Sequence, residues 1–192
     1  MTSDEATAAS RRMEPDVTLT PEQLAHTIRS IPDFPKPGIL FRDITTLLKD
    51  PEAFRSAVDL MAAPFVGQRI DIVVGVESRG FVFATPLAYR LNAGFVLVRK
   101  PGKLPAPTVR AEYALEYGAN VLEMHVDAIR PGQHVLIVDD LLATGGTVNA
   151  TIQLVERLGG VVVGISFLVE LRDLHGREVL VGYPNVHAVI SY

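Results

Sequence analysis

The segment VLIVDDLLATGGT at residues 135–147 constrains the fold of this chain more than any other stretch. Its leading apolar residues are typical of a strand buried on both faces, and residues 148–158 carry apolar side chains at helical spacing. Asp139 and Asp140 fall where such a strand ends, and a pair of glycines opens the connection to the helix. We therefore expect a strand, an acidic pair, a glycine-rich turn and a helix in succession.

This succession favours a site for a phosphorylated sugar. The first turn of a helix offers unpaired backbone N–H groups to a phosphate, and Thr144 and Thr147 add hydroxyl donors. Two neighbouring carboxylates would repel a phosphate, so Asp139 and Asp140 suit sugar hydroxyls or a divalent metal. No lysine follows the glycines, which excludes the Walker pattern. The alternative is a buried strand whose last aspartate caps the next helix.

The composition bounds the class of protein. A length of 192 residues with 48% hydrophobic content is enough for one domain with a sizeable core, and a net charge of −4 indicates no general nucleic-acid or membrane partner. The absence of cysteine excludes disulfides and thiolate chemistry. No apolar run could span a bilayer and the first residues lack a secretory signal, so we expect a cytoplasmic protein.

Strands alternate with helices along the chain, which predicts an α/β fold: a parallel β-sheet flanked by helices, with a small N-terminal hood. We expect residues 1–18, which are small and polar, to be disordered, and residues 19–192 to form a single domain. The predicted helices cover about 20–30, 50–66, 80–92 and 148–158; the strands cover 70–76, 95–99, 121–126, 135–138 and 161–169; loops cover 31–38 and 101–118; and short edge elements lie near 179–181 and 188–190.

Two further constellations carry positive charge. Arg79 lies in a turn at the carboxyl end of a predicted strand, where it suits bidentate contact with phosphate oxygens or caps a surface turn. Lys100 and Lys103 share a compact turn with Arg99, which forms either an anion site or a solvated basic loop. The five histidines are scattered without the spacing of metal ligands.

Two segments have an unusual composition for connections. Residues 104–118 form a long segment that is either a lid excluding water from the site or a surface hairpin, and Glu116 is its most interesting carboxylate, with Tyr117 beside it. Residues 31–45 combine prolines with apolar and aromatic residues, which suits either a rigid pocket wall or a strap that packs on the core.

Residues 135–147 resemble the signature of the phosphoribosyltransferases, which bind 5-phosphoribosyl-1-pyrophosphate (PRPP). Residues 31–45 are similar to the pattern FPxPGxxFRD, followed by a helix, of the adenine phosphoribosyltransferase family. The resemblance continues through residues 99–104, 116–118 and 169–171, and it covers about residues 20–180. It implies an enzyme of purine salvage, a pentosyltransferase that converts adenine and PRPP to AMP and pyrophosphate.

The resemblance also implies roles for particular residues. Asp139 and Asp140 would hold the ribose hydroxyls, and Glu116 would be an acid/base for the adenine proton, with Tyr117 in the lid. Mg²⁺ would be carried by PRPP rather than ligated directly by the protein, and the chain would form a homodimer. The 5′-phosphate would be wrapped by Ala143, Thr144, Gly145, Gly146 and Thr147; the pyrophosphate would be bound by Arg79, Lys100 and Lys103, with Arg79 also catalytic; and adenine would contact Leu40, Phe41, Arg42 and Leu171.

Two alternatives remain open at this point. A phosphoribosyltransferase for xanthine, hypoxanthine or a pyrimidine would need a pocket with donors and acceptors exchanged, because those bases carry an oxo group where adenine carries an amino group. A regulator that senses PRPP without turning it over usually has a nucleic-acid-binding part, for which the sequence offers no basic face.

Overall fold

The computed structural model describes residues 19–115 and 118–192. The prediction for residues 1–18 and the roles predicted for Glu116 and Tyr117 lie outside the described residues. The chain divides into two compact units, one that ends at Leu60 and one that begins at Met61.

The first unit begins with the helix that was predicted from about residue 20. The Thr20 side chain accepts a hydrogen bond from the backbone N–H of Gln23, and the Gln23 side chain accepts one from the backbone N–H of Thr20. Pro21 fits the first helical position, where the helix needs no N–H donor. The helices of this unit are α1 (Pro21–Thr27), α2 (Thr45–Leu48) and α3 (Pro51–Ala62), whose last residues pass into the second unit.

The helix predicted over about residues 20–30 is shorter than expected, and the predicted loop at 31–38 connects two short strands. Helix α1 ends at Thr27 rather than near residue 30, because the chain extends into strand β1 (Arg29–Ile31), which pairs antiparallel with β2 (Phe41–Asp43). The ribbon is held by Arg29, whose Nε donates to a carboxylate oxygen of Asp43 at 3.1 Å. A cross-strand ion pair of this kind depends on tertiary pairing, so helical periodicity alone did not locate the end of α1.

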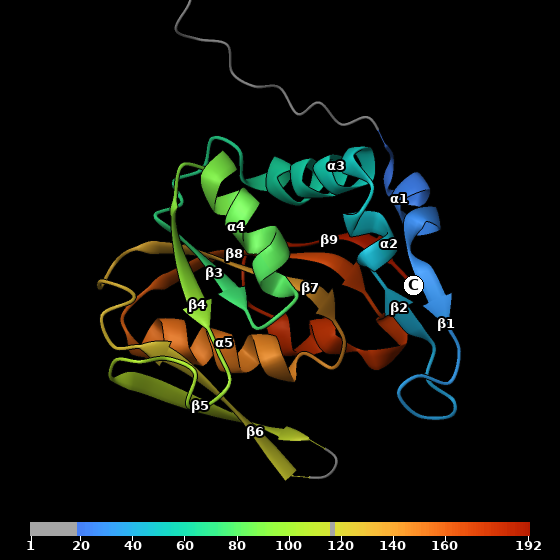
Figure 1. The fold of residues 1–192 in the computed structure, drawn as a ribbon. Helices are drawn as coiled ribbons and strands as arrows, with labels where there is room; N and C mark the ends of the chain where they lie inside the picture. The colour runs from blue at the N-terminus through green and yellow to red at the C-terminus, as the bar shows by residue number, and fades with distance from the viewer. Residues whose placement is uncertain (1–18, 116–117) are drawn as a thin grey trace, which may run out of the picture. The chain divides into compact units, whose positions relative to one another are not determined.

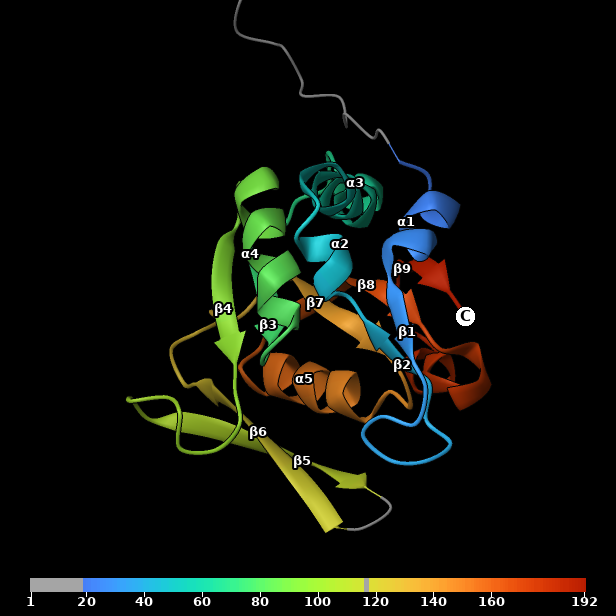
Figure 2. The same ribbon diagram turned by 45° about the vertical axis from the view of Figure 1, so that its right-hand side comes forward.

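The second unit is built on a five-stranded parallel sheet with the order β4-β3-β7-β8-β9. The predicted class, a parallel sheet flanked by helices, is confirmed: α4 packs on β3 and β7, whereas α5 packs on β7 and β8 from the other side (Figures 1 and 2). The strands are β3 (Ile72–Val76), β4 (Gly94–Val98), β7 (His134–Leu142), β8 (Val161–Glu170) and β9 (Val186–Ser191), and the helices are η1 (Ala63–Phe65), α4 (Gly80–Arg90), α5 (Gly146–Arg157), η2 (Arg172–Leu174) and η3 (Gly176–Leu180).

The order of the strands reverses between β3 and β7. From β3 the chain crosses through α4 to β4 on one side, and from β7 it crosses through α5 to β8 on the other. In open parallel sheets, ligands bind outside the carboxyl ends of the strands at such a reversal. The turn after β3 and the loop after β7, which the sequence analysis singled out, both lie there.

Strand β7 has the predicted burial on both faces, since the side chains at residues 135–138 are fully buried. It continues to Leu142, so Asp139 and Asp140 belong to its last part, close to the strand end at which they were predicted. The pairing of β7 with β8 extends as far as Leu142 and Glu170, which keeps the strand regular beyond the acidic pair. The aspartates therefore sit on a rigid element rather than on a loop.

Of the two alternatives for residues 104–118, the structure shows the hairpin, and the loop expected over 101–118 is strand from Thr108 onward within the described residues. Strand β5 (Thr108–Leu115) pairs with β6 (Gly118–His125), and β5 lies against α5 (Figure 2). Two short edge elements were predicted near the end of the chain. The one at 188–190 lies in β9, which forms an edge of the sheet, whereas the one at 179–181 is corrected, because the 3₁₀ helix η3 reaches Leu180. Among the described residues, no helix is long and apolar enough to cross a membrane.

Candidate active site

A cavity of about 520 Å³ opens at the carboxyl ends of β3 and β7. It unites three of the predicted groups, namely the turn that contains Arg79, the acidic pair and the glycine-rich loop. All of them come from the second unit. The cavity is lined by Glu77, Ser78, Arg79, Tyr113, Asp139, Asp140, Leu141, Leu142, Ala143, Thr144, Gly145, Gly146, Thr147 and Val148.

The acidic pair is bound to the start of α4. The Arg79 Nε lies 2.8 Å from a carboxylate oxygen of Asp140, which is only 6% exposed. A Cβ at Gly80 would lie 2.6 Å from a carboxylate oxygen of Asp139, so only glycine lets α4 begin this close to β7. The ion pair means that Arg79 meets the acidic pair in this structure, and a pyrophosphate would have to compete with Asp140 for its guanidinium.

Burial controls the ionisation of the two aspartates. Burial raises the pKa of Asp139 well above its ordinary value, and the neighbouring charge of Asp140 raises it further. Burial also raises the pKa of Asp140, although the Arg79 guanidinium opposes this shift. Perturbed carboxyl groups at a cavity are typical of functional sites. A pair with this tendency to hold a proton can accept and donate hydrogen bonds, which suits vicinal sugar hydroxyls.

The loop between β7 and α5 is shaped by Gly145, which has a φ of +85°. A Cβ there would lie 2.3 Å from the Cγ2 of Val179 and 2.8 Å from the carbonyl oxygen of Gly176, so both conformation and space require glycine. As the residue before α5, Gly145 has no side chain to cap the helix, and the first-turn amides border the cavity. These amides and the positive end of the helix dipole can hold a phosphate.

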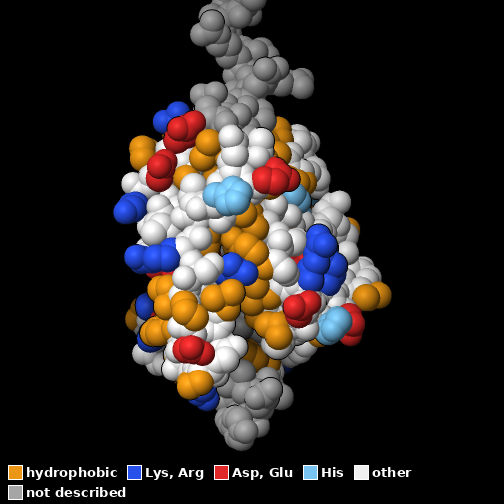
Figure 3. Space-filling view, turned by 90° about the vertical axis from the view of Figure 1, so that its right-hand side faces the viewer, with side chains coloured by type: hydrophobic (Ala, Val, Ile, Leu, Met, Phe, Trp, Pro, Cys, Tyr) orange, Lys and Arg blue, Asp and Glu red, His pale blue; other side chains and the backbone are white. Residues whose placement is uncertain are grey.

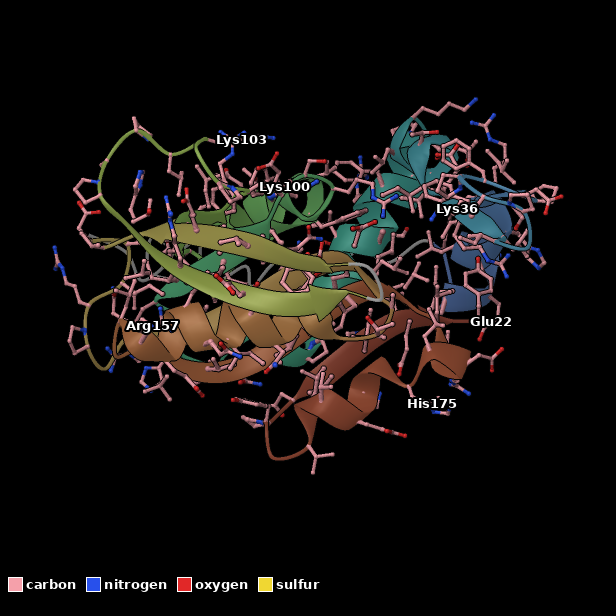
Figure 4. All side chains as sticks on the ribbon, turned by 90° about the horizontal axis from the view of Figure 1, so that it is seen from below. Glu22, Lys36, Lys100, Lys103, Arg157 and His175 are labelled. Carbon is pink, nitrogen blue, oxygen red and sulfur yellow. The ribbon has the colours of Figure 1, made fainter. Side chains whose placement is uncertain are left out.

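The predicted basic turn lies beside the cavity but does not line it. The Glu77 carboxylate contacts the Lys103 ammonium, accepts a hydrogen bond from the Lys100 backbone N–H at 3.0 Å, and lies 3.3 Å from the Arg99 Nε. Burial pushes the pKa of Glu77 upward, but the hydrogen bonds from Lys103 and from the amide of Lys100 outweigh it and hold this pKa below its ordinary value. Figure 4 labels Lys100 and Lys103 on the connection after β4.

Sequence reasoning gave no role to Glu77 or Tyr113, both of which line the cavity. Glu77 organises the basic turn through contacts with residues 22–26 positions away, which no local pattern reveals. Tyr113 lines the cavity from β5, and the alternation of side chains along TVRAEYAL was the signal that could have placed it on a strand.

The residues predicted to contact the base occupy separate units. In the first unit, Phe41 packs edge-to-face on Phe34 with ring centroids 5.1 Å apart, and Arg42 donates to the Ser30 hydroxyl at 2.6 Å. Leu40 is exposed in the same unit. In the second unit, Leu171 follows β8 and donates its backbone N–H to the Leu142 carbonyl. The predicted adenine contacts of these residues stay predictions.

The family described as "Phosphoribosyl transferase domain" matches residues 45–184, which is most of the chain and includes every element of the cavity. The chain therefore belongs to the phosphoribosyltransferase family.

Individual relatives narrow the class. The chain is 58% identical over 166 residues to the adenine phosphoribosyltransferase of Acidobacterium capsulatum, covering 86% of this chain and 92% of the relative. It is 61% identical over 165 residues to that of Alkaliphilus metalliredigens, covering 86% and 96%. These two relatives support the adenine branch of the family for this chain.

Solved structures agree with the relatives. The adenine phosphoribosyltransferase from Thermoanaerobacter pseudethanolicus superposes with a TM-score of 0.87 at 54% identity, over 90% of this chain and 100% of that chain. The one from Saccharomyces cerevisiae, complexed with an imino-altritol bisphosphate and adenine, superposes with a TM-score of 0.82 at 39% identity, over 88% and 97%. Both identities are high enough for the likeness to extend beyond the fold.

Proposed function

We propose that this chain is an enzyme of purine salvage that transfers the 5-phosphoribosyl group from PRPP to adenine, giving AMP and pyrophosphate. One observation carries the proposal: a single cavity brings together an arginine turn, an acidic pair and a glycine-rich helix start. These groups match the pyrophosphate, the ribose hydroxyls and the 5′-phosphate of PRPP. Arg79 follows β3, and residues 143–147 follow β7, which carries Asp139 and Asp140 and pairs with β3.

In the reaction, a ring nitrogen of adenine forms a bond to the anomeric carbon while the bond from that carbon to pyrophosphate breaks. The chain needs no nucleophile of its own, since its task is to align the two reactants and to stabilise the departing charge. Asp139 and Asp140 hold the ribose, and the amides and hydroxyls of residues 143–147 hold the 5′-phosphate.

The positive groups bind the leaving pyrophosphate. Arg79 exchanges Asp140 for a phosphate oxygen, and Lys103 exchanges Glu77 for another, with Lys100 beside it. Such exchanges keep each cation paired before and after binding, which avoids leaving a half-buried charge without a partner. The proton that adenine loses passes to Glu116, an assignment that lies outside the described residues.

The cofactor that we propose is Mg²⁺, which offsets negative charge on the pyrophosphate when PRPP brings it in. The donor set at the cavity fits an ion that arrives with its own phosphate ligands. Asp139 and Asp140 form an acidic pair there, and the described residues contain no group of three His, Cys, Asp or Glu side chains that could hold a metal ion.

The choice of adenine is supported by the relatives, and by the Saccharomyces structure that was solved with adenine. We assign adenine contacts to Leu40, Phe41, Arg42 and Leu171. A nucleic-acid-binding regulator is disfavoured by the net charge of −4, and the one face that Figure 3 shows carries both basic and acidic side chains.

A homodimer in the cytoplasm completes the proposal, with small-molecule substrates as the partners and neither nucleic acid nor membrane among them. Sedimentation equilibrium of the full chain should give twice the mass of 20.9 kDa. A mass of one chain would overturn the dimer and leave the proposed reaction standing.

The reaction is tested by incubating the purified chain with PRPP, Mg²⁺ and one base at a time, and by separating the nucleotides chromatographically. We expect AMP from adenine and no product from hypoxanthine, xanthine or a pyrimidine. Product from another base alone would overturn the assignment of adenine. Absence of product from every base, with PRPP still bound, would favour the regulator instead.

A further inference from the structure

Tyr113 is the one cavity residue whose side chain comes from the β5–β6 hairpin within the described part of the chain. Neither the resemblance nor the proposed reaction gives it a role. Its position combines three independent observations: it lines the cavity, its ring covers the first residue of α5, and its hydroxyl reaches a threonine of the glycine-rich loop.

The ring lies directly on Gly146. A Cβ at this position would lie 2.9 Å from the Cδ2 atom and 3.6 Å from the Cε2 atom of Tyr113. Gly146 is the first residue of α5, whose backbone N–H groups border the cavity. The absence of a side chain at Gly146 is therefore what allows an aromatic ring from another element to cover the helix start.

The hydroxyl of Tyr113 belongs to the same network as the phosphate donors. The Thr147 hydroxyl lies 3.4 Å from the phenol oxygen, and the Asn120 side-chain amide donates to this oxygen at 3.2 Å. Because the phenol oxygen accepts in both contacts, its own proton can be donated to a further acceptor. A phosphate held by the backbone N–H groups of the first turn, that of Thr147 among them, would bring such an acceptor within reach of the phenol.

We propose that the Tyr113 hydroxyl is a further ligand of the 5′-phosphate, so that the hairpin supplies one donor to a subsite otherwise built from the β7–α5 loop. This inference rests on the proposed function in placing a 5′-phosphate at that loop. The phosphate thereby connects α5 to β5, and the hairpin is held at its other end by Arg157 of α5, which donates to the Arg110 carbonyl. Figure 4 labels Arg157 near the far end of α5 from the glycine-rich loop.

A ligand of the 5′-phosphate has no contact with pyrophosphate, so loss of the Tyr113 hydroxyl should affect the binding of only one end of PRPP. The decisive variant is Tyr113→Phe, which keeps the ring on Gly146 and removes only the hydroxyl. The matched control is Tyr89→Phe, because Tyr89 lies on α4 with 90% of its surface exposed. Isothermal titration of the full chain uses ribose 5-phosphate and pyrophosphate as separate probes.

We expect Tyr113→Phe to weaken the binding of ribose 5-phosphate roughly 10- to 100-fold, as is typical for loss of a hydrogen bond to a charged group, and to leave the binding of pyrophosphate unchanged. The KM for PRPP should rise, whereas Tyr89→Phe should change neither affinity. Unchanged binding of ribose 5-phosphate would overturn the inference. Equal weakening of both probes would also overturn it, because the hydroxyl would then act on the cavity as a whole.

The same titrations distinguish failure of the inference from failure of the proposed function. If the parent chain binds ribose 5-phosphate in a Tyr113-dependent manner but forms no AMP from adenine and PRPP, the phosphate ligand stands and the reaction fails. If the parent forms AMP and the hydroxyl proves irrelevant, the reaction stands and the ligand fails.

Discussion

The glycine-rich loop owes its shape to Gly145, so substitution by alanine should be costly for two separable reasons. The residue has a φ of +85°, and a side chain in this region costs roughly 1–2 kcal/mol. The added Cβ would also lie 2.3 Å from Val179 and 2.8 Å from the Gly176 carbonyl. Forcing a group into a packed position adds about 1–3 kcal/mol. Gly145→Ala should therefore lower the free energy of unfolding by roughly 2–5 kcal/mol.

Gly182→Ala is the matched control. Gly182 has a similar left-handed φ of +98°, but no atom lies within 4 Å of the position that its Cβ would take. This variant should lose only the conformational part, roughly 1–2 kcal/mol. Urea denaturation followed by circular dichroism gives both values, and binding of PRPP should be weakened in Gly145→Ala alone. Equal losses of stability in the two variants would refute the packing of this loop against residues 176–179.

Three further predictions concern charge. Arg177→Met should lower the free energy of unfolding by roughly 1–3 kcal/mol, because it removes the bidentate partner of the buried Glu170. Arg69→Met, which breaks an exposed ion pair, should lower it by less than about 1 kcal/mol. Equal losses for the two variants in urea denaturation would contradict this prediction. Burial raises the pKa of Asp139, so its stabilising contribution is present below the ordinary pKa and is lost as the pH rises. The melting temperature of Asp139→Asn should therefore rise relative to that of the parent from about pH 4 upward. A difference in melting temperature that does not change with pH would be the contrary result. Hydrogen bonds from Arg29 lower the pKa of Asp43 to about 2. The parent should therefore have a higher melting temperature than Asp43→Asn, and this difference should shrink as the pH falls from about 4 towards 2. A difference that persists in acid would exclude this contribution of Asp43.

Local patterns in the sequence were enough to predict the elements that carry the site. The apolar run at 135–138 has the composition of a strand buried on both faces, and the structure places it at the centre of the parallel sheet. The helix predicted from about residue 20 begins at Pro21, after a capping box formed by Thr20 and Gln23. Both signals depend on neighbours within a few positions, so they survive without knowledge of the tertiary structure.

Contacts between distant segments account for what was not predicted. Strand β5 alternates apolar and polar side chains, but its pairing with β6 joins residues on either side of a turn, so the sequence left a lid and a surface hairpin both open. Glu77 follows β3 and contacts the basic turn that follows β4, the neighbouring strand of the sheet. Tyr113 contacts Thr147, which lies 34 positions further along the chain. Residues of this kind were missed because their partners are defined by the sheet and not by the sequence nearby.

The central claim is that one cavity holds both ends of PRPP, with the 5′-phosphate at residues 143–147 and the pyrophosphate at Arg79. Phosphorus-31 NMR of the full chain with Mg²⁺, ribose 5-phosphate and pyrophosphate tests it most directly. The account predicts that both probes bind at the same time and that added PRPP displaces both. Mutual exclusion of the two probes, or a probe that stays bound when PRPP saturates the protein, would contradict it.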